Sequence, residues 1–109
     1  MEVLSNAGRY TPPDPGQDGR YTEELRVPDL SVGTYCLPAG GVDTQRPHTE
    51  DEVYVVVSGR ARLTADSGTV EVGPGAVVFV PAGEGHRFTD IAEDLTVLVF
   101  FGPAEYTRR

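Results

Sequence analysis

From Glu23 onward the chain alternates short apolar runs with turn-forming segments, and this alternation limits the fold more than any other feature. The runs are rich in Val and too short for ordinary helices, which is typical of β-strands. Gly and Pro lie at most of the breaks, and the sequence offers no helix signal apart from the short stretch 91–94. The expected strands cover residues 23–27, 31–37, 53–57, 60–65, 69–72, 76–80, 86–89 and 95–101. This density of short strands predicts an all-β sandwich or barrel.

Residues 1–22 differ from the rest because Pro, Gly and Asp are common there and apolar residues are scarce. Prolines between Thr11 and Gly16 remove backbone donors and restrict the residues that precede them. We therefore interpret residues 1–22 as an extended N-terminal arm and residues 23–109 as the folded barrel. A chain of 109 residues is long enough for one hydrophobic core only. The Pro and Tyr content of the arm favours packing against a partner subunit.

The charge of the chain disfavours two classes of partner. It contains 17 acidic and 9 basic residues, for a net charge of −8. Such a charge repels phosphate backbones and anionic lipids, so we expect neither nucleic acid nor membrane as a partner. No apolar run approaches the roughly 20 residues of a membrane helix, and the N-terminus lacks a signal-peptide pattern. The lone Cys36 cannot form an internal disulfide, so we expect a cytoplasmic protein.

The only two histidines, His48 and His86, each lie beside an expected strand. Glu52 follows His48 closely, but on a continuous strand the two would be roughly 13 Å apart, too far to share an ion. A turn through residues 49–51 would bring them together, and His86 follows a glycine-rich bend. Two imidazoles and one carboxylate suit Fe(II) and also accommodate Mn, Ni, Co or Zn. The simpler interpretation is two unrelated histidines and a solvated acidic turn.

These two segments resemble the two sequence motifs of the cupin superfamily. The first motif, G(X)5HXH(X)3–4E(X)6G, aligns with Gly40, Arg46, His48, Glu52 and Gly59. The second, G(X)5PXG(X)2H(X)3N, aligns with Gly75, Pro81, Gly83, His86 and Asp90. The resemblance covers residues 40–59 and 75–90. It implies the cupin fold, an all-β double-stranded β-helix or jelly-roll barrel.

The resemblance also implies a metal site. Cupins with the full motif bind metal through three His and one Glu, so the residues carried over here are His48, Glu52 and His86. The implied cofactor is a divalent transition metal such as Fe, Mn, Ni, Co or Zn. Arg46 replaces the first motif histidine and cannot ligate a cation, because its guanidinium stays protonated and offers donors only. Asp90 replaces the final Asn. Cupins without bound metal exist, so a metal-free pocket is the alternative.

Arg46 and His48 alternate along one expected strand, so both should face the same side, which the cupin fold makes the barrel interior. A buried guanidinium needs an anion to offset its desolvation. That anion would be either an internal acid such as Glu52 or a carboxylate or phosphate of the substrate, held by two hydrogen bonds. Alternatively, Arg46 lies at the barrel mouth and its guanidinium reaches water.

Tyr54 and Phe88 each lie two residues after an expected ligand, so strand alternation places them on the same faces as the ligands. Both are therefore candidates for substrate binding, although aromatic residues at this spacing are more often ordinary core. Of the neighbours Tyr35 and Cys36, one must face inward, and the pattern does not say which.

The resemblance implies a small single-domain cupin that acts on a small organic, possibly anionic, molecule. Dioxygenase-type and isomerase- or lyase-type chemistry both fit a site of two His and one carboxylate, and the sequence identifies no catalytic residue. The alternative is a non-catalytic cupin module that binds a small ligand without metal. Small cupins commonly pair through edge strands, so we expect a homodimer with the N-terminal arm reaching across it.

Overall fold

The computed structural model describes residues 1–107 and contains eight β-strands, one for each strand expected from the sequence. They are β1 (Arg20–Val27), β2 (Leu30–Leu37), β3 (Asp51–Ser58), β4 (Ala61–Ala65), β5 (Gly68–Val72), β6 (Val77–Val80), β7 (His86–Thr89) and β8 (Leu95–Gly102). The described residues include no helix, the stretch 91–94 included, and thus no helix that could cross a membrane. The all-β prediction is confirmed.

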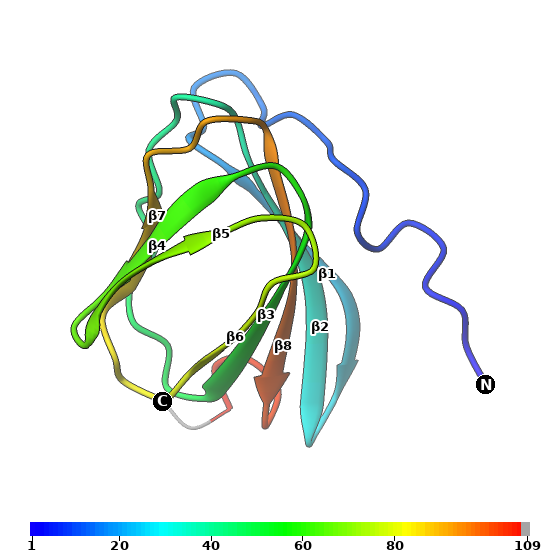
Figure 1. The fold of residues 1–109 in the computed structure, drawn as a ribbon. Helices are drawn as coiled ribbons and strands as arrows, with labels where there is room; N and C mark the ends of the chain where they lie inside the picture. The colour runs from blue at the N-terminus through cyan, green and yellow to red at the C-terminus, as the bar shows by residue number, and fades with distance from the viewer. Residues whose placement is uncertain (108–109) are drawn as a thin grey trace.

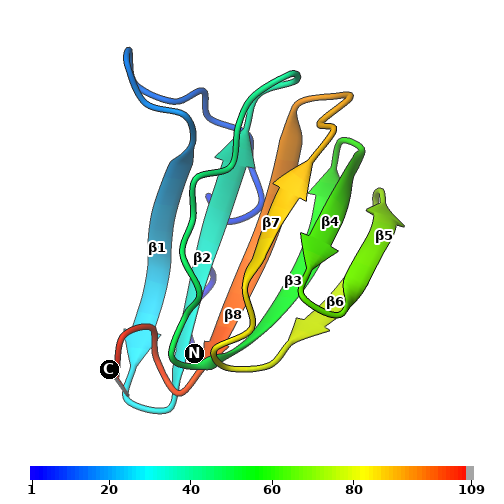
Figure 2. The ribbon, with the colours of Figure 1, turned by 90° about the vertical axis from the view of Figure 1, so that its left-hand side faces the viewer.

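The strands form two antiparallel sheets that face each other across the interior (Figures 1 and 2). The larger sheet has the strand order β1-β2-β8-β3-β6, and the smaller has the order β5-β4-β7. Strands distant in sequence are therefore neighbours: β8 lies between β2 and β3. This arrangement brings the segments before β3, at the start of β7 and after β8 to one region of the molecule.

The core lies between the sheets, and the alternation of side chains along β3 shows how it is built. Glu52, Tyr54 and Val56 are buried, whereas the residues between them are partly exposed. Successive side chains of a strand point to opposite faces, so these three share the inner face. From the second sheet, Leu63 and Phe88 pack against this face. An ionisable residue, Glu52, is thus placed among apolar side chains.

Gly59 closes β3 in a conformation that other residues rarely adopt. Its φ is +90°, and a Cβ added there would lie 2.3 Å from the carbonyl oxygen of Asp94. The close approach lets the chain turn sharply from β3 into β4 beside the start of β8. This conformation and this close approach explain why a glycine occupies the last position of the first motif.

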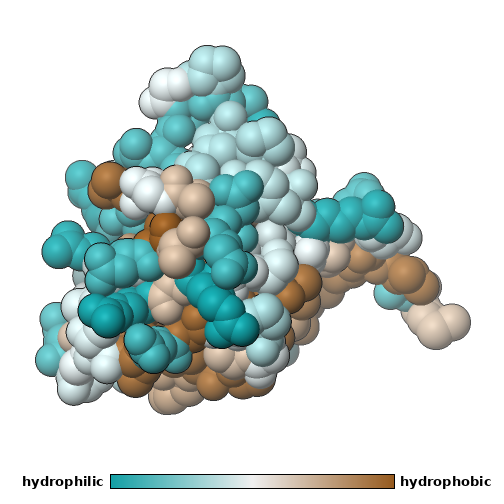
Figure 3. Space-filling view, turned by 45° about the horizontal axis from the view of Figure 1, so that its top comes forward, coloured by the Kyte–Doolittle hydropathy of each residue, from teal (hydrophilic) through white to brown (hydrophobic). Residues whose placement is uncertain are grey.

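The N-terminal arm packs on its own chain. The amide of Gly8 donates to Thr34 Oγ1 at 3.0 Å, and the Cys36 thiol lies 3.6 Å from the carbonyl oxygen of Arg9. β2 is consequently covered on both faces, by the core and by the arm, while the first residues project from the body (Figure 3). β1 begins at Arg20, within the segment assigned to the arm. Whether the arm also contacts a partner subunit stays a prediction.

Candidate functional site

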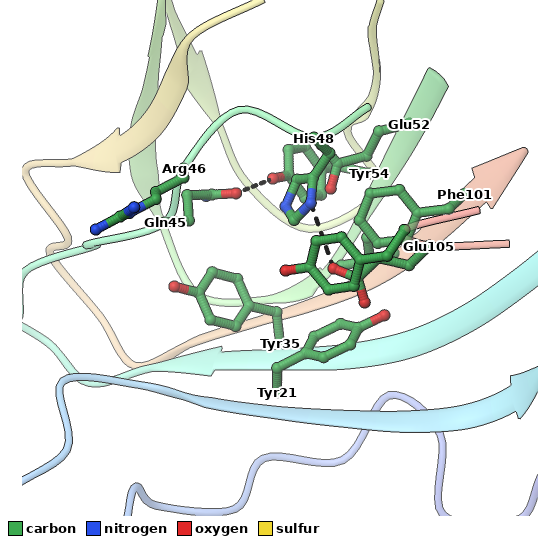
Figure 4. A pocket seen from close by; sticks show the side chains of 11 residues that line it. Tyr21, Tyr35, Gln45, Arg46, His48, Glu52, Tyr54, Phe101 and Glu105 are labelled. Carbon is green, nitrogen blue, oxygen red and sulfur yellow. Dashed lines mark hydrogen bonds and ion pairs between the residues drawn. The ribbon is translucent and has the colours of Figure 1, made fainter. Parts of the chain in front are cut away.

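A pocket of about 320 Å³ lies over one face of the larger sheet, where residues 41–50 and 103–107 enclose it (Figure 4). A volume of this size suits a small organic molecule. The lining is mostly aromatic and acidic and comprises Tyr21, Tyr35, Gln45, Arg46, His48, Glu52, Tyr54, Val99, Phe101, Glu105 and Tyr106. Strands β1, β2, β3 and β8 all contribute. His86 lies next to this pocket and lines an adjoining hollow with Gln45 and Pro47.

Glu52 and His86, which lie on different sheets, form a close pair of ionisable groups at the site. His86 Nε2 is 2.9 Å from Glu52 Oε1 and 2.9 Å from the Tyr54 hydroxyl. The other ring nitrogen, Nδ1, is 2.8 Å from the carbonyl oxygen of Glu84, which can only accept a hydrogen bond. Nδ1 therefore carries a proton, and in neutral His86 Nε2 is an unprotonated acceptor that lies 2.9 Å from the Glu52 carboxylate.

Two acceptors 2.9 Å apart repel each other, so this contact is stable only with a proton or a metal ion between the two groups. Burial alone lowers the pKa of His86, but Glu52 and the Glu84 carbonyl outweigh burial and raise it. Nevertheless, buried Glu52 Oε1 has no aligned hydrogen bond from any residue within 1–107. An unsatisfied buried carboxylate oxygen is costly, so the donor set and its arrangement fit a cation held by His86 and Glu52.

His48 reaches the same region from the loop before β3, but it turns toward a different carboxylate. Its Nδ1 is 3.3 Å from Glu105 Oε2 (Figure 4), and its ring centre is 6.2 Å from that of His86. Burial lowers the pKa of His48 and favours the neutral imidazole. Within the described part of the chain, no three His, Cys, Asp or Glu side chains converge on one point. The structure thus brings two of the three expected ligands together and places the third beside them.

Arg46 lies at the rim of the pocket, and strand alternation was the wrong basis for expecting it in the interior. Residues 41–50 form no strand, and Arg46 is exposed. Figure 4 shows its guanidinium directed away from His48 and from the tyrosines at the base of the pocket. The observed position is the barrel-mouth alternative, from which the side chain reaches water.

The two aromatic candidates occupy different positions. The Tyr54 hydroxyl lines the pocket and donates to Gln45 Oε1 at 2.9 Å, and burial raises the pKa of Tyr54 well above its usual value. Phe88 is 2% exposed and packs on the Tyr54 ring with centroids 5.0 Å apart. Phe88 is not among the pocket-lining residues, so its position is that of ordinary core.

The structure also decides the orientation of the neighbours on β2. Tyr35 faces the pocket and donates to Asp43 Oδ1 at 2.6 Å. Cys36 faces the arm, and burial raises the pKa of its thiol. Asp43 in turn accepts from the Phe88 amide at 2.8 Å and from the Gln45 side chain. This buried carboxylate holds together the loop before β3, the pocket floor and β7.

Sequence reasoning missed the contributions of Asp43, Gln45, Tyr21 and Glu105 to this region. Glu105 lies after the last strand, outside both motifs, and is 8% exposed. No local pattern marks it, since only the packing of the chain end against β2 and β3 brings it near His48. The preference of Asp for turns does not predict that Asp43 would bridge three segments.

Comparison with known proteins agrees with this architecture. Residues 33–101 match the family model described as Cupin domain. An uncharacterized protein of Streptomyces coelicolor is 54% identical over 88 residues, which are 81% of this chain and 84% of that protein.

Two solved structures share the fold at low sequence identity. KdgF from Halomonas sp. superposes with a TM-score of 0.73 at 20% identity, covering 86% of this chain and 88% of that one. DMSP lyase DddQ from Ruegeria pomeroyi gives a TM-score of 0.75 at 18% identity, covering 94% of this chain and 54% of that one. The opposed sheets, both motifs and these matches lead to one conclusion: the chain belongs to the cupin family and has its double-stranded β-helix fold.

Proposed function

We propose that this protein is a metal-binding cupin that acts on a small organic molecule in the pocket. The observation that carries the proposal is the close approach of His86 Nε2 and Glu52 Oε1, two acceptors whose repulsion a bound metal ion would relieve. His86 and Glu52 would hold a divalent transition metal (Fe, Mn, Ni, Co or Zn), and His48 on the adjoining loop would be the third ligand. When bound, such an ion supplies Lewis acidity and open coordination positions.

Among the reaction types open to such a site, the environment of Tyr54 favours isomerase- or lyase-type over dioxygenase-type chemistry. The raised pKa of Tyr54 keeps its hydroxyl protonated, so it can donate a hydrogen bond or carry a proton to a substrate oxygen. Its hydrogen bond to Gln45 orients it at the pocket wall. Isomerisation and elimination both need a proton carrier, and Tyr54 has the position for that role.

The pocket lining supports a small substrate with an apolar body. Tyr21, Tyr35 and Phe101 supply aromatic surface, and Arg46 at the rim would contact an anionic group of a substrate that extends toward the mouth. Phe88 would act through packing, because it supports the Tyr54 ring from the core.

Metal analysis of protein purified without chelator tests the proposal. We expect about one equivalent of a transition metal, or its uptake from Co²⁺ or Zn²⁺ added to the apo protein. His86→Ala and Glu52→Ala should abolish binding, whereas the exposed Glu93→Ala serves as a matched control. Absence of metal from the wild-type protein under every loading condition would falsify the metal assignment.

One observation favours a second candidate function, a metal-free cupin module that binds a small ligand without catalysis. His48 pairs with Glu105 and does not converge with Glu52 and His86, and a proton on His86 would satisfy Glu52 without metal. In that case the protein binds no metal, and His86 in the folded state stays protonated at pH values above the usual pKa of histidine. Histidine NMR signals of the chelator-treated protein distinguish the two candidates.

We also propose a cytoplasmic homodimer. The lone Cys36 is the basis for the compartment, and the exposed edge strands of the larger sheet are the basis for self-association. Light scattering tests the assembly, since a monomer at micromolar concentration contradicts it.

A further inference from the structure

A glycine in the middle of β2 makes room for an aromatic ring on the floor of the pocket. Tyr21 on β1 lies directly opposite Tyr35 on β2, and Gly33 shares the inner face of β2 with Tyr35. A Cβ added to Gly33 would lie 2.1 Å from the Tyr21 hydroxyl oxygen and 2.2 and 2.5 Å from Cζ and Cε1 of the same ring. Because these three bonded neighbours are all so close, the Tyr21 ring lies across the Gly33 backbone, and its other face lines the pocket.

Three more aromatic rings line the space above this floor. The Tyr35 ring is inclined by 67° to the Tyr21 ring, with centroids 6.3 Å apart, and Asp43 accepts a hydrogen bond from its hydroxyl. Figure 4 shows both rings at the base of the pocket. Phe101 on β8 and Tyr106 beyond it belong to the same lining. We call these four rings, Tyr21, Tyr35, Phe101 and Tyr106, the aromatic cage.

The charged groups around the aromatic cage are mainly acidic. Glu52 and Glu105 belong to the pocket lining, and Asp43 lies against the Tyr35 hydroxyl. Burial raises the pKa of Tyr35, and the charge of Asp43 raises it further, so the phenol stays neutral. Among the lining residues only Arg46 carries a permanent positive charge, and its guanidinium is directed away from the tyrosines (Figure 4). An anion at the base of the pocket would therefore meet acidic neighbours and no basic partner.

Aromatic faces next to acidic groups favour one class of ligand. The face of a phenol or phenyl ring carries partial negative charge and attracts a cation, most strongly when the cation has lost its water. An alkylated ammonium group loses water readily, because its methyl groups donate no strong hydrogen bonds. A neutral apolar ligand would fill the same volume without gaining this attraction.

We propose that the aromatic cage binds the alkylated ammonium group of a small organic cation. This inference deepens the proposed function by naming the substrate class of the same pocket, and it rests on that function only for the ligand's being a substrate. The cage receives the end of the molecule that reaches the base of the pocket. Arg46 at the rim remains available to an anionic group at the other end.

Calorimetric titration with choline and with dimethylbutanol, its neutral carbon isostere, tests the proposal. The two probes have nearly the same shape, so a site that recognises only apolar bulk binds the neutral alcohol at least as well. We expect choline to bind about 5- to 30-fold more tightly, which is the gain typical of a cation on partly to fully desolvated aromatic faces. Equal affinities, or binding of neither probe, overturn the proposal.

Variants at the floor of the pocket attribute the preference to the ring. Tyr21→Leu keeps the charge and the apolar bulk but removes the aromatic face, so choline should lose most of its advantage over the isostere. Tyr21→Phe keeps the face and is the matched control, which should retain the preference. Gly33→Ala, whose Cβ displaces the same ring, should act like Tyr21→Leu. An unchanged preference in both Tyr21→Leu and Gly33→Ala would come from the acidic protein in general and overturns the cage. If neither variant folds, the two isosteres on the wild type still decide.

The titrations are run on chelator-treated protein and repeated after addition of Zn²⁺, which separates the cage from the metal site. A preference for choline without any uptake of metal supports the cage and rejects the proposed metal function. Uptake of metal with no preference for choline in either form rejects the cage and leaves the metal function standing.

Discussion

The two halves of the site are held by the chain in different ways. The strand half consists of Glu52, Tyr54 and His86, which lie on β3 and β7 and are almost fully buried. The loop half consists of Arg46, His48 and Glu105, which lie on segments without strand pairing. Ladder hydrogen bonds and core packing fix the strand half. The loop half is held by hydrogen bonds that involve side chains and by isolated backbone bonds, such as that from the Gly83 amide to the His48 carbonyl oxygen. We infer that the strand half is the more rigidly held of the two.

The largest expected effect is a loss of metal affinity, and it is tested by removing one proposed ligand from each half. Glu52→Ala removes the proposed anionic ligand from the strand half. Loss of a residue that only orients a ligand costs up to about 100-fold in metal affinity, and we expect the loss here to be larger. His48→Ala should weaken binding less, because His48 does not converge with the other two residues. Calorimetric titration with Zn²⁺ measures both. Equal losses would show that the two halves contribute alike.

The second largest expected effect is a loss of stability when Gly59, at the end of β3 in the strand half, is replaced. Gly59→Ala places a Cβ against the Asp94 carbonyl oxygen at a φ of +90°, which L-residues rarely adopt. We expect the free energy of unfolding to fall by about 2–4 kcal/mol, from left-handed strain and the steric overlap. Urea denaturation measures this loss of stability. Gly75→Ala is the matched control for backbone strain alone, because Gly75 has a φ of +89° and a Cβ added there would meet no atom within 4 Å. A loss no larger than that of the control would remove the steric argument.

A smaller and more local effect is expected in the loop half. Glu50 is buried and accepts the Tyr106 amide, so Glu50→Ala should destabilise the protein by about 1–3 kcal/mol through an unsatisfied donor. Hydrogen exchange should accelerate mainly at residues 104–107 and hardly in β3. If protection falls equally in both places, the chain end is not a separate unit from the strands.

Arg46→Ala should have the smallest effect on the fold. An exposed side chain such as Arg46 typically contributes less than about 0.5 kcal/mol, so stability and metal content should be retained. If Arg46 contacts an anionic substrate, the affinity for small carboxylates should fall while stability and metal content stay unchanged. Loss of folding would contradict its position at the rim and indicate an internal ion pair.

The difference between the halves also explains which parts of the site could be predicted from sequence. Strand periodicity correctly put Glu52 and Tyr54 on one inner face, because alternation of side chains follows directly from an extended backbone. The same rule failed for Arg46, because the loop that carries it has no strand geometry. Glu105 had no local signal, since its role depends on a contact with a residue far away in the chain.

The sequence by itself determined the eight strands, the cupin signature and the residue types available for a metal site, because turn chemistry and side-chain alternation are local properties. Only the tertiary structure decided that Tyr35 faces the pocket and Cys36 the arm. It alone directed His48 toward Glu105 and brought His86 to Glu52. These relations depend on how two sheets and a chain end pack together, and long-range packing leaves no periodic pattern in the sequence.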